Sequence, residues 1–248
     1  MTLVLLTPVG LDARMWDVVG LGGTEAVRHE WPGFGARPRA PAPPDMAALA
    51  DEVAASHPGP LDVVGCSMGG MVGQHLAIRH PDRVRSLLVA CTGAAAVASV
   101  LDRARAAEET GMEGVLRSTL ERWFTPEALA RRPEPPGVAY ARETLLSLDP
   151  RAFADGWRAI ATHDARPRLS QITARTTCVA GRQDVSAPVA RVREVADGIP
   201  GARLVVVDGP HMLPLERPEA FRDLVRRHLA GAVWENGAVP EVEEEERT

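Results

Sequence analysis

The chain has 248 residues, of which 45% are hydrophobic and 25% charged, and its formal net charge is −5. This length and balance predict a single α/β domain, and an acidic chain without a basic block is a poor partner for nucleic acid. No run approaches the roughly 18 apolar residues of a membrane span, and the apolar N-terminus is too short for a signal peptide, so we expect a cytoplasmic protein with no membrane association. The three cysteines lack metal-ligand spacing, and we expect no metal or other cofactor.

The N-terminal part of the chain alternates between short apolar runs and longer amphipathic ones. We expect strands at residues 3–6, 27–31, 61–64 and 86–90, and helices at residues 45–57 and 71–80. Continuous apolar strands that alternate with helices are typical of a parallel sheet covered on both faces. Charged and apolar residues alternate at 27–31, which favours a half-exposed strand there.

The pentapeptide Gly65-Cys66-Ser67-Met68-Gly69 lies between the third of these strands and the second helix. A G-x-S-x-G sequence at a sharp strand-to-helix turn exposes the serine hydroxyl, and its glycines avoid backbone clashes. The helix behind the turn directs the positive end of its dipole toward the reacting atom. We therefore expect Ser67 to be a nucleophile, with Cys66, which would face the other side of the turn, as the weaker alternative.

About 85 residues separate the strand that ends near residue 90 from the next one, although a crossover needs only about a dozen. The surplus is helical in pattern, so we expect residues 95–168 to form a cap inserted into a core made of residues 1–94 and 169–231. The cap holds half of the aromatic residues, which either fill its own core or line a pocket, and Trp123 and Trp157 are the expected substrate contacts. The arginines that are either surface residues or ligands for a substrate carboxylate are Arg117, Arg122, Arg131 and Arg142.

The C-terminal part predicts strands at residues 177–180 and 203–207 and helices at 189–196 and 218–229, followed by an acidic, solvated tail at 232–248. Asp184 and His211 come just after the two strands. A serine nucleophile needs a base and an acid that orients the base, and in parallel sheets such partners lie at the carboxyl ends of later strands. We expect Ser67, Asp184 and His211 to form a catalytic triad. The competing acids are Asp12 and Asp208, of which the second fits a loop-shaping role better.

From residue 1 to about 230 the chain resembles the α/β-hydrolase superfamily, and within it the 3-oxoadipate enol-lactonase type. The matching segments are Gly10 to Trp16, Gly65 to Gly70, Arg122 to Pro126, and Pro210 to Pro214. The resemblance implies that Ser67 attacks, that His211 acts as general base and then acid, and that Asp184 orients it. It also implies an oxyanion hole made by the backbone N–H groups of Val9 and Met68, and it makes Met212 a third expected substrate contact.

Three departures from that pattern affect these expectations. One is the bulky Trp157 in a segment at 149–160 that otherwise resembles the lactonase pattern, so the pocket shape and the substrate need not carry over. Thr7-Pro8 stands where relatives usually have His-Gly, but the donor needed for the oxyanion is the N–H of Val9, which proline leaves available. The chain also begins at what resembles the third strand of the usual fold, which predicts a shortened, mostly parallel sheet of about six strands. The strand at 27–31 then has an open edge, which stays in solvent, is covered by the tail, or joins two copies into a homodimer.

The leading hypothesis is a cofactor-free serine hydrolase that cleaves a small ester or lactone through an acyl-enzyme on Ser67. One alternative is hydrolysis of a C–C bond or a thioester. Another is lyase or cyclase chemistry of a biosynthetic pathway that uses the same triad. A ligand receptor without catalysis is a further alternative, against which the complete triad argues. In each case the partner is a small molecule.

Overall fold

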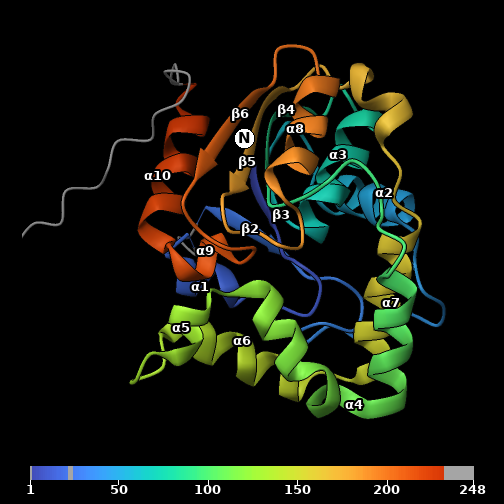
Figure 1. The fold of residues 1–248 in the computed structure, drawn as a ribbon. Helices are drawn as coiled ribbons and strands as arrows, with labels where there is room; N and C mark the ends of the chain where they lie inside the picture. The colour runs from blue at the N-terminus through green and yellow to red at the C-terminus, as the bar shows by residue number, and fades with distance from the viewer. Residues whose placement is uncertain (1, 22–24, 232–248) are drawn as a thin grey trace, which may run out of the picture.

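The computed structural model describes residues 2–21 and 25–231, which form a sheet with helices on both faces and a group of helices across one end (Figure 1). The sheet has six strands in the order β2-β1-β3-β4-β5-β6. All five neighbouring pairs of strands in the described residues are parallel, so the expected shortened α/β-hydrolase sheet is confirmed. The strands are β1 (Thr2–Leu6), β2 (Ala26–His29), β3 (Leu61–Cys66), β4 (Val84–Ala90), β5 (Arg175–Gly181) and β6 (Arg203–Val207).

Two groups of helices cover the sheet. α1 (Met15–Val19) and α10 (Pro218–Leu229) lie on one face, and α2 (Met46–Ser56), α3 (Met68–Arg79) and α8 (Val189–Gly198) lie on the other (Figure 1). The sequence did not predict α1 or α9 (Leu213–Glu216), since one turn or so carries too little periodicity to detect. No helix in residues 2–21 and 25–231 is long and apolar enough to cross a membrane.

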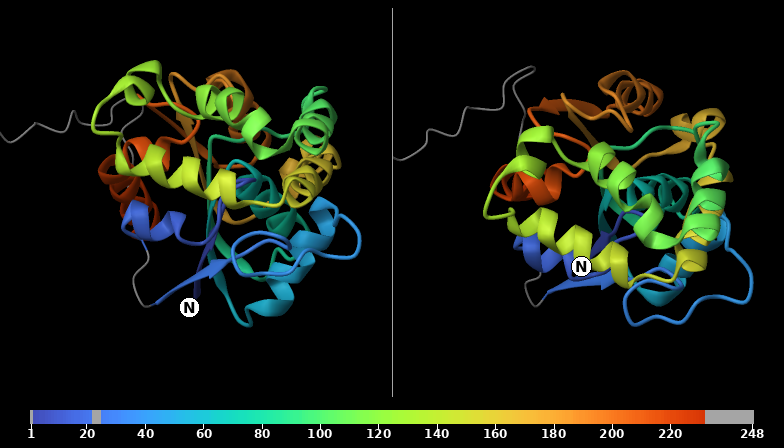
Figure 2. Two further views of the ribbon diagram at one scale, coloured as in Figure 1. Left: turned by 90° about the horizontal axis from the view of Figure 1, so that it is seen from below. Right: turned by 60° about the horizontal axis from the view of Figure 1, so that its bottom comes forward.

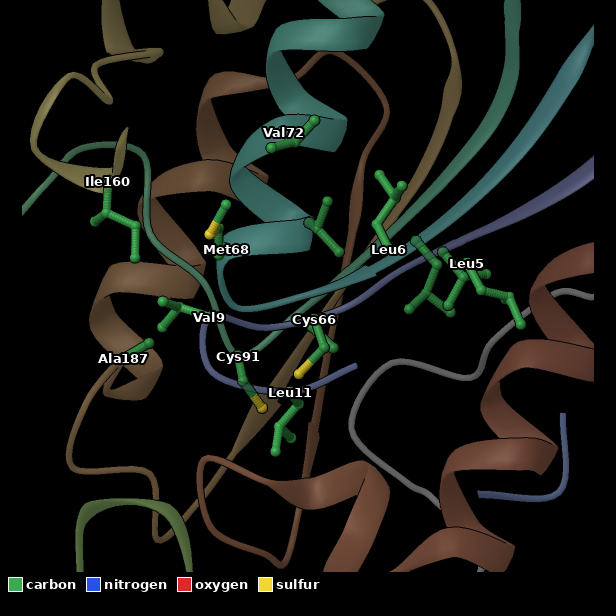
Figure 3. Close-up of a cluster of buried hydrophobic side chains, with 14 of the residues drawn as sticks. Leu5, Leu6, Val9, Leu11, Cys66, Met68, Val72, Cys91, Ile160 and Ala187 are labelled. Carbon is green, nitrogen blue, oxygen red and sulfur yellow. The ribbon is translucent and has the colours of Figure 1, made fainter. Parts of the chain in front are cut away.

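The centre of the sheet is fully enclosed. Every residue of β3 is buried, because it has neighbours on both edges and helices on both faces. Figure 3 shows the apolar side chains that surround the end of this strand, among them Leu6 from β1 and Val72 from α3. This packing fixes the backbone from which the candidate nucleophile projects.

Between β4 and β5 the chain forms four helices that lie across the carboxyl ends of the strands (Figures 1 and 2). They are α4 (Val100–Trp123, kinked at Gly111), α5 (Pro126–Ala130), α6 (Pro136–Ser147) and α7 (Pro150–Ala161). Three of them start with proline, whose fixed φ and missing N–H suit the first helical turn. A short 3-10 helix at Arg166–Gln171 leads back to the sheet. We call α4–α7 the cap.

The two connections between cap and sheet run side by side. The amide of Ala96 donates to the carbonyl of His163 at 2.8 Å, and that of Ala165 donates to Ala94 at 2.8 Å. The buried imidazole of His163 bonds the carbonyl of Gly93 at 3.0 Å and His75 of α3 at 3.1 Å. His163 therefore joins both connections to the helix behind the candidate nucleophile.

β2 lies at the edge of the sheet and pairs only with β1 within the described part of the chain. It ends at His29, however, and Trp31 is buried, with its indole N–H donating to the carbonyl of Thr7 at 3.0 Å. The expectation of an open strand reaching Trp31 is wrong, because burial of the large indole turns the chain inward. The tail at 232–248, which is one of the three coverings that the sequence hypothesis gave this edge, lies outside the described residues.

Candidate active site

Ser67 occupies a strained turn between β3 and α3. Its φ of 51° and ψ of −115° are rare for a residue with a Cβ atom. A Cβ atom at Gly65 would overlap the carbonyl of Gly69, and one at Gly69 would overlap the carbonyl of Leu6. Both glycines are therefore required so that the strand and the helix can approach closely enough to hold the serine in this conformation.

Three side chains from three strand ends meet in one hydrogen-bonded line. The hydroxyl of Ser67, after β3, lies 3.0 Å from Nε2 of His211, which follows β6. Nδ1 of His211 lies 2.9 Å from Oδ2 of Asp184, which follows β5. The three expected triad residues are thus brought together, because parallel strands place their carboxyl ends on the same edge of the sheet.

Asp184 is held in its ionised form. Burial alone would raise the pKa of this carboxyl, but the neighbouring His211 and the backbone N–H groups of Ala187 and Ser186 outweigh burial and lower the pKa. Both amides donate to Oδ1 at 2.8 Å, which leaves Oδ2 for the imidazole. The carboxylate can therefore fix the histidine tautomer that accepts a proton from Ser67.

The alternative residues lie elsewhere. Asp12 binds the side chain of Arg14 and accepts from the hydroxyl of Tyr140 at 3.0 Å, and the exposed Asp208 pairs with Arg182. Neither acid contacts His211. The Cys66 side chain is buried among apolar groups near Leu11 and Cys91 (Figure 3).

The two amides expected to form the oxyanion hole flank the serine. Val9 follows β1 and lines the same cavity as Ser67, whereas Met68 is the first residue of α3. Over the residues that the structure covers, neither amide donates to a protein acceptor. Two free N–H groups near a nucleophile can stabilise an oxyanion, and the N-terminus of α3 adds its positive dipole end.

A cavity of about 40 Å³ lies between the strand ends and the cap. Ser67 and His211 form its floor, and Trp123 and Trp157 line it from the cap, as expected. Met212 does not line it: the residue is buried, and its amide donates to the carbonyl of Trp123 at 2.8 Å. The structure thus gives Met212 a role in placing Trp123 and no contact with the cavity.

Sequence reasoning missed two arginines in the cavity wall, Arg103 of α4 and Arg191 of α8. The position of Arg103 three residues after Val100 places both on one face of a helix, which is the pattern that could have identified it. The cap arginines we named do not line the cavity: Arg117 and Arg142 pair with Glu121 and Glu134, Arg131 is exposed and Arg122 is half-buried.

No group of three or more His, Cys, Asp or Glu side chains within residues 2–21 and 25–231 is arranged to hold a metal ion. The chemistry that this site can perform with its own residues is nucleophilic attack by a serine, assisted by a histidine base.

Comparison with known proteins supports the same fold. The profile of the alpha/beta hydrolase family matches residues 3–224. 3-Oxoadipate enol-lactonase 2 of Acinetobacter baylyi is 32% identical over 163 residues, which are 65% of this chain and 60% of that protein, so the match spans less than two thirds of the relative's length. The pimeloyl-(acyl-carrier protein) methyl ester esterase of Chromobacterium violaceum is 33% identical over 187 residues, covering 70% of each chain.

Among solved structures, the enol-lactonase from Burkholderia xenovorans LB400 superposes with a TM-score of 0.86 at 28% identity, covering 92% of this chain and 91% of that one. The resemblance to the enol-lactonase type that the motifs indicated is therefore confirmed. Since the family profile extends over most of the sequence and the fold agrees with that of the enol-lactonase, this chain belongs to the alpha/beta hydrolase family.

Proposed function

We propose that the protein is a serine hydrolase that cleaves a small carboxylic ester or lactone through an acyl-enzyme on Ser67. The observation that carries this proposal is the hydrogen-bonded line from Ser67 through His211 to the buried Asp184, which opens into a cavity beneath the cap.

The reaction follows from this geometry in two halves. Nε2 of His211 takes the proton of Ser67 as Oγ attacks the substrate carbonyl, and the N–H groups of Val9 and Met68 bind the resulting oxyanion. The protonated imidazole then passes its proton to the leaving alcohol oxygen, which departs and leaves the acyl group on Ser67. Water, deprotonated by His211, releases the acid and restores the serine.

The size of the cavity limits the substrate. Its volume of about 40 Å³ is far below the roughly 300–1,000 Å³ of pockets for drug-sized ligands. The acyl part that lies beside Ser67 beneath the cap is therefore short. Relatives named as an enol-lactonase and a methyl ester esterase support a substrate with an ester or lactone carbonyl and do not select one compound.

Turnover of p-nitrophenyl acetate and of a small lactone by wild type and Ser67→Ala tests the proposal. We expect Ser67→Ala to lose about 10⁴-fold or more in kcat, since members of a triad act as a unit. Its thermal midpoint should stay close to that of wild type. Cys66→Ala is the matched control and should remain active. A Ser67→Ala variant that keeps a tenth of the activity would refute the proposed nucleophile, and a wild type that hydrolyses no ester or lactone would favour the lyase or receptor alternatives.

A further inference from the structure

The backbone on the two sides of His211 is held by different parts of the molecule. Before the histidine, the amide of Gln183 donates to the carbonyl of Gly209 at 3.0 Å. Gly181 of β5 lies so close to the same carbonyl that a Cβ atom at this glycine would be 2.4 Å from its oxygen. The chain therefore reaches His211 from a position that the sheet fixes.

After the histidine, the chain packs on the cap. The amide of Met212 donates to the carbonyl of Trp123, the last residue of α4, at 2.8 Å. α9, which follows, lies against α6, since a Cβ atom at Gly137 would be 2.3 Å from the carbonyl oxygen of Leu215. The direction in which the chain leaves His211 is thus set by the cap.

Glu216, the last residue of α9, makes the one contact of this group that involves a charged side chain. Its Oε2 accepts from the amide of Thr125 at 2.9 Å, and its Oε1 accepts from the hydroxyl of Thr125 at 2.8 Å. Thr125 is buried, and its hydroxyl also accepts from the amide of Ala128 in α5 at 3.2 Å. Hydrogen bonds to an ionised acceptor are roughly twice as strong as neutral ones, so this paired contact fixes both distance and direction.

The Glu216–Thr125 contact lies near both the base and the cavity wall. Glu216 is five residues after His211, and Thr125 is two residues after Trp123, which lines the cavity. Because the amide of Met212 also bonds Trp123, the cap segment and the histidine segment are joined at two points. A shift of one segment must move the other.

We propose that Glu216 and Thr125 are positioning residues, which hold the cap against the histidine segment and so keep the imidazole of His211 aligned with Ser67. This inference rests on the proposed function and adds to it two residues outside the triad. Nε2 of His211 lies 3.0 Å from the serine hydroxyl, inside the range of about 2.6–3.2 Å that proton transfer needs. A misplacement of about 1 Å can lower the rate roughly 100-fold, so a modest shift of this segment is enough to impair the base.

Hydrolysis of p-nitrophenyl acetate by variants at both ends of the contact tests the proposal. Glu216→Ala should lower kcat by about 10- to 100-fold and change KM by less than about threefold, because alignment of the base is lost and the acetyl group is still bound. Glu216→Gln, whose amide oxygen can still accept from the N–H of Thr125, should lie in between. Thr125→Val removes the hydroxyl from the cap side and should also lower kcat, whereas Thr125→Ser should restore it.

Glu219→Ala is the matched control, because Glu219 is exposed and pairs with Arg222 on the next helix, α10. It should keep wild-type kcat. Wild-type kcat in both Glu216→Ala and Thr125→Val, or a loss confined to KM, would overturn the positioning role. Ser67-dependent hydrolysis by wild type, and with it the proposed function, would still stand.

Hydrogen exchange tests the same inference without turnover. The amide of Met212 should exchange about tenfold or more faster in Glu216→Ala than in wild type, because the segment that holds it against Trp123 is loosened. The amide of Val63 in the buried strand β3 should keep its wild-type rate, and Glu219→Ala should match wild type at both amides. This result would support the positioning role even if wild type hydrolysed no ester, and an unchanged rate at Met212 would overturn it.

Discussion

On the sheet side of the cavity, the reactive groups are placed by backbone geometry. Ser67, Asp184 and His211 follow β3, β5 and β6, and glycines permit the close approach that holds the serine. On the cap side, Arg103 and Trp157 project from α4 and α7 and are held only by contacts between side chains. We therefore expect the sheet side to tolerate fewer substitutions than the cap side.

This difference assigns separate tasks to the two walls. Under the proposed function, the sheet side determines the reaction and the cap side determines which small molecule undergoes it. The same division explains how one fold serves many substrates, since side chains on inserted helices vary independently of the strand ends. Each of the following predictions alters one side or the connection between them.

The largest effect is expected for Asp184→Asn. The Asn carbonyl can still accept from the amides of Ser186 and Ala187, but its amide nitrogen then faces Nδ1 of His211 and favours the wrong tautomer. We expect kcat to fall about 10⁴-fold with little change in thermal midpoint. Asp208→Asn, at an exposed ion pair, should keep near-wild-type kcat, and the opposite ranking of the two variants would show that the acid is wrongly assigned.

Gly69→Ala should have the next largest effect, and on folding stability. The added methyl group would overlap the backbone carbonyl of Leu6 in β1, which cannot move without disturbing the sheet. We expect the free energy of unfolding to fall by about 3 kcal/mol.

Gly73→Ala in the same helix is the control for Gly69→Ala. Its nearest neighbour is the movable end of Leu87 at 3.0 Å, and alanine favours the helix, so stability should change by about 1 kcal/mol or less. Equal losses for the two variants in urea unfolding would contradict the steric account of the turn.

The sheet side was also the more predictable from sequence. Continuous apolar runs, a G-x-S-x-G turn and an acid and histidine just past later strands carry local signals, and Ser67, Asp184 and His211 meet as those signals indicated. The cap gave no such signal. Helical periodicity indicates which residues share a face, but which face meets the cavity depends on how helices pack in three dimensions. Arg103 was missed for that reason. Met212 was expected to contact the substrate, although it does not line the cavity and its amide donates to the carbonyl of Trp123.

The smallest predicted effect concerns the connection between the two sides. Burial lowers the pKa of His163 from its ordinary 6.5 to about 4. Between these values the unfolded chain binds more protons than the folded one, so the free energy of unfolding falls as the pH drops from about 6.5 toward 4. At about 1.4 kcal/mol per pKa unit, His163 accounts for at most about 3 kcal/mol of this loss.

His163→Gln keeps a donor for the carbonyl of Gly93 but cannot titrate. Its free energy of unfolding should fall less between pH 6.5 and 4 than that of wild type. Parallel curves for wild type and His163→Gln in chemical unfolding would rule out His163 as a source of the acid sensitivity.

The central claim is that the strand-end serine becomes covalently acylated. Incubation with a fluorophosphonate followed by peptide mass spectrometry tests it most directly, because such a reagent traps the activated nucleophile. We predict one adduct per chain, on Ser67, formed quickly by wild type and at least a hundredfold more slowly by Asp184→Asn, whose imidazole is wrongly oriented. An adduct on Cys66, or continued ester hydrolysis by a protein that takes up no label, would contradict the account.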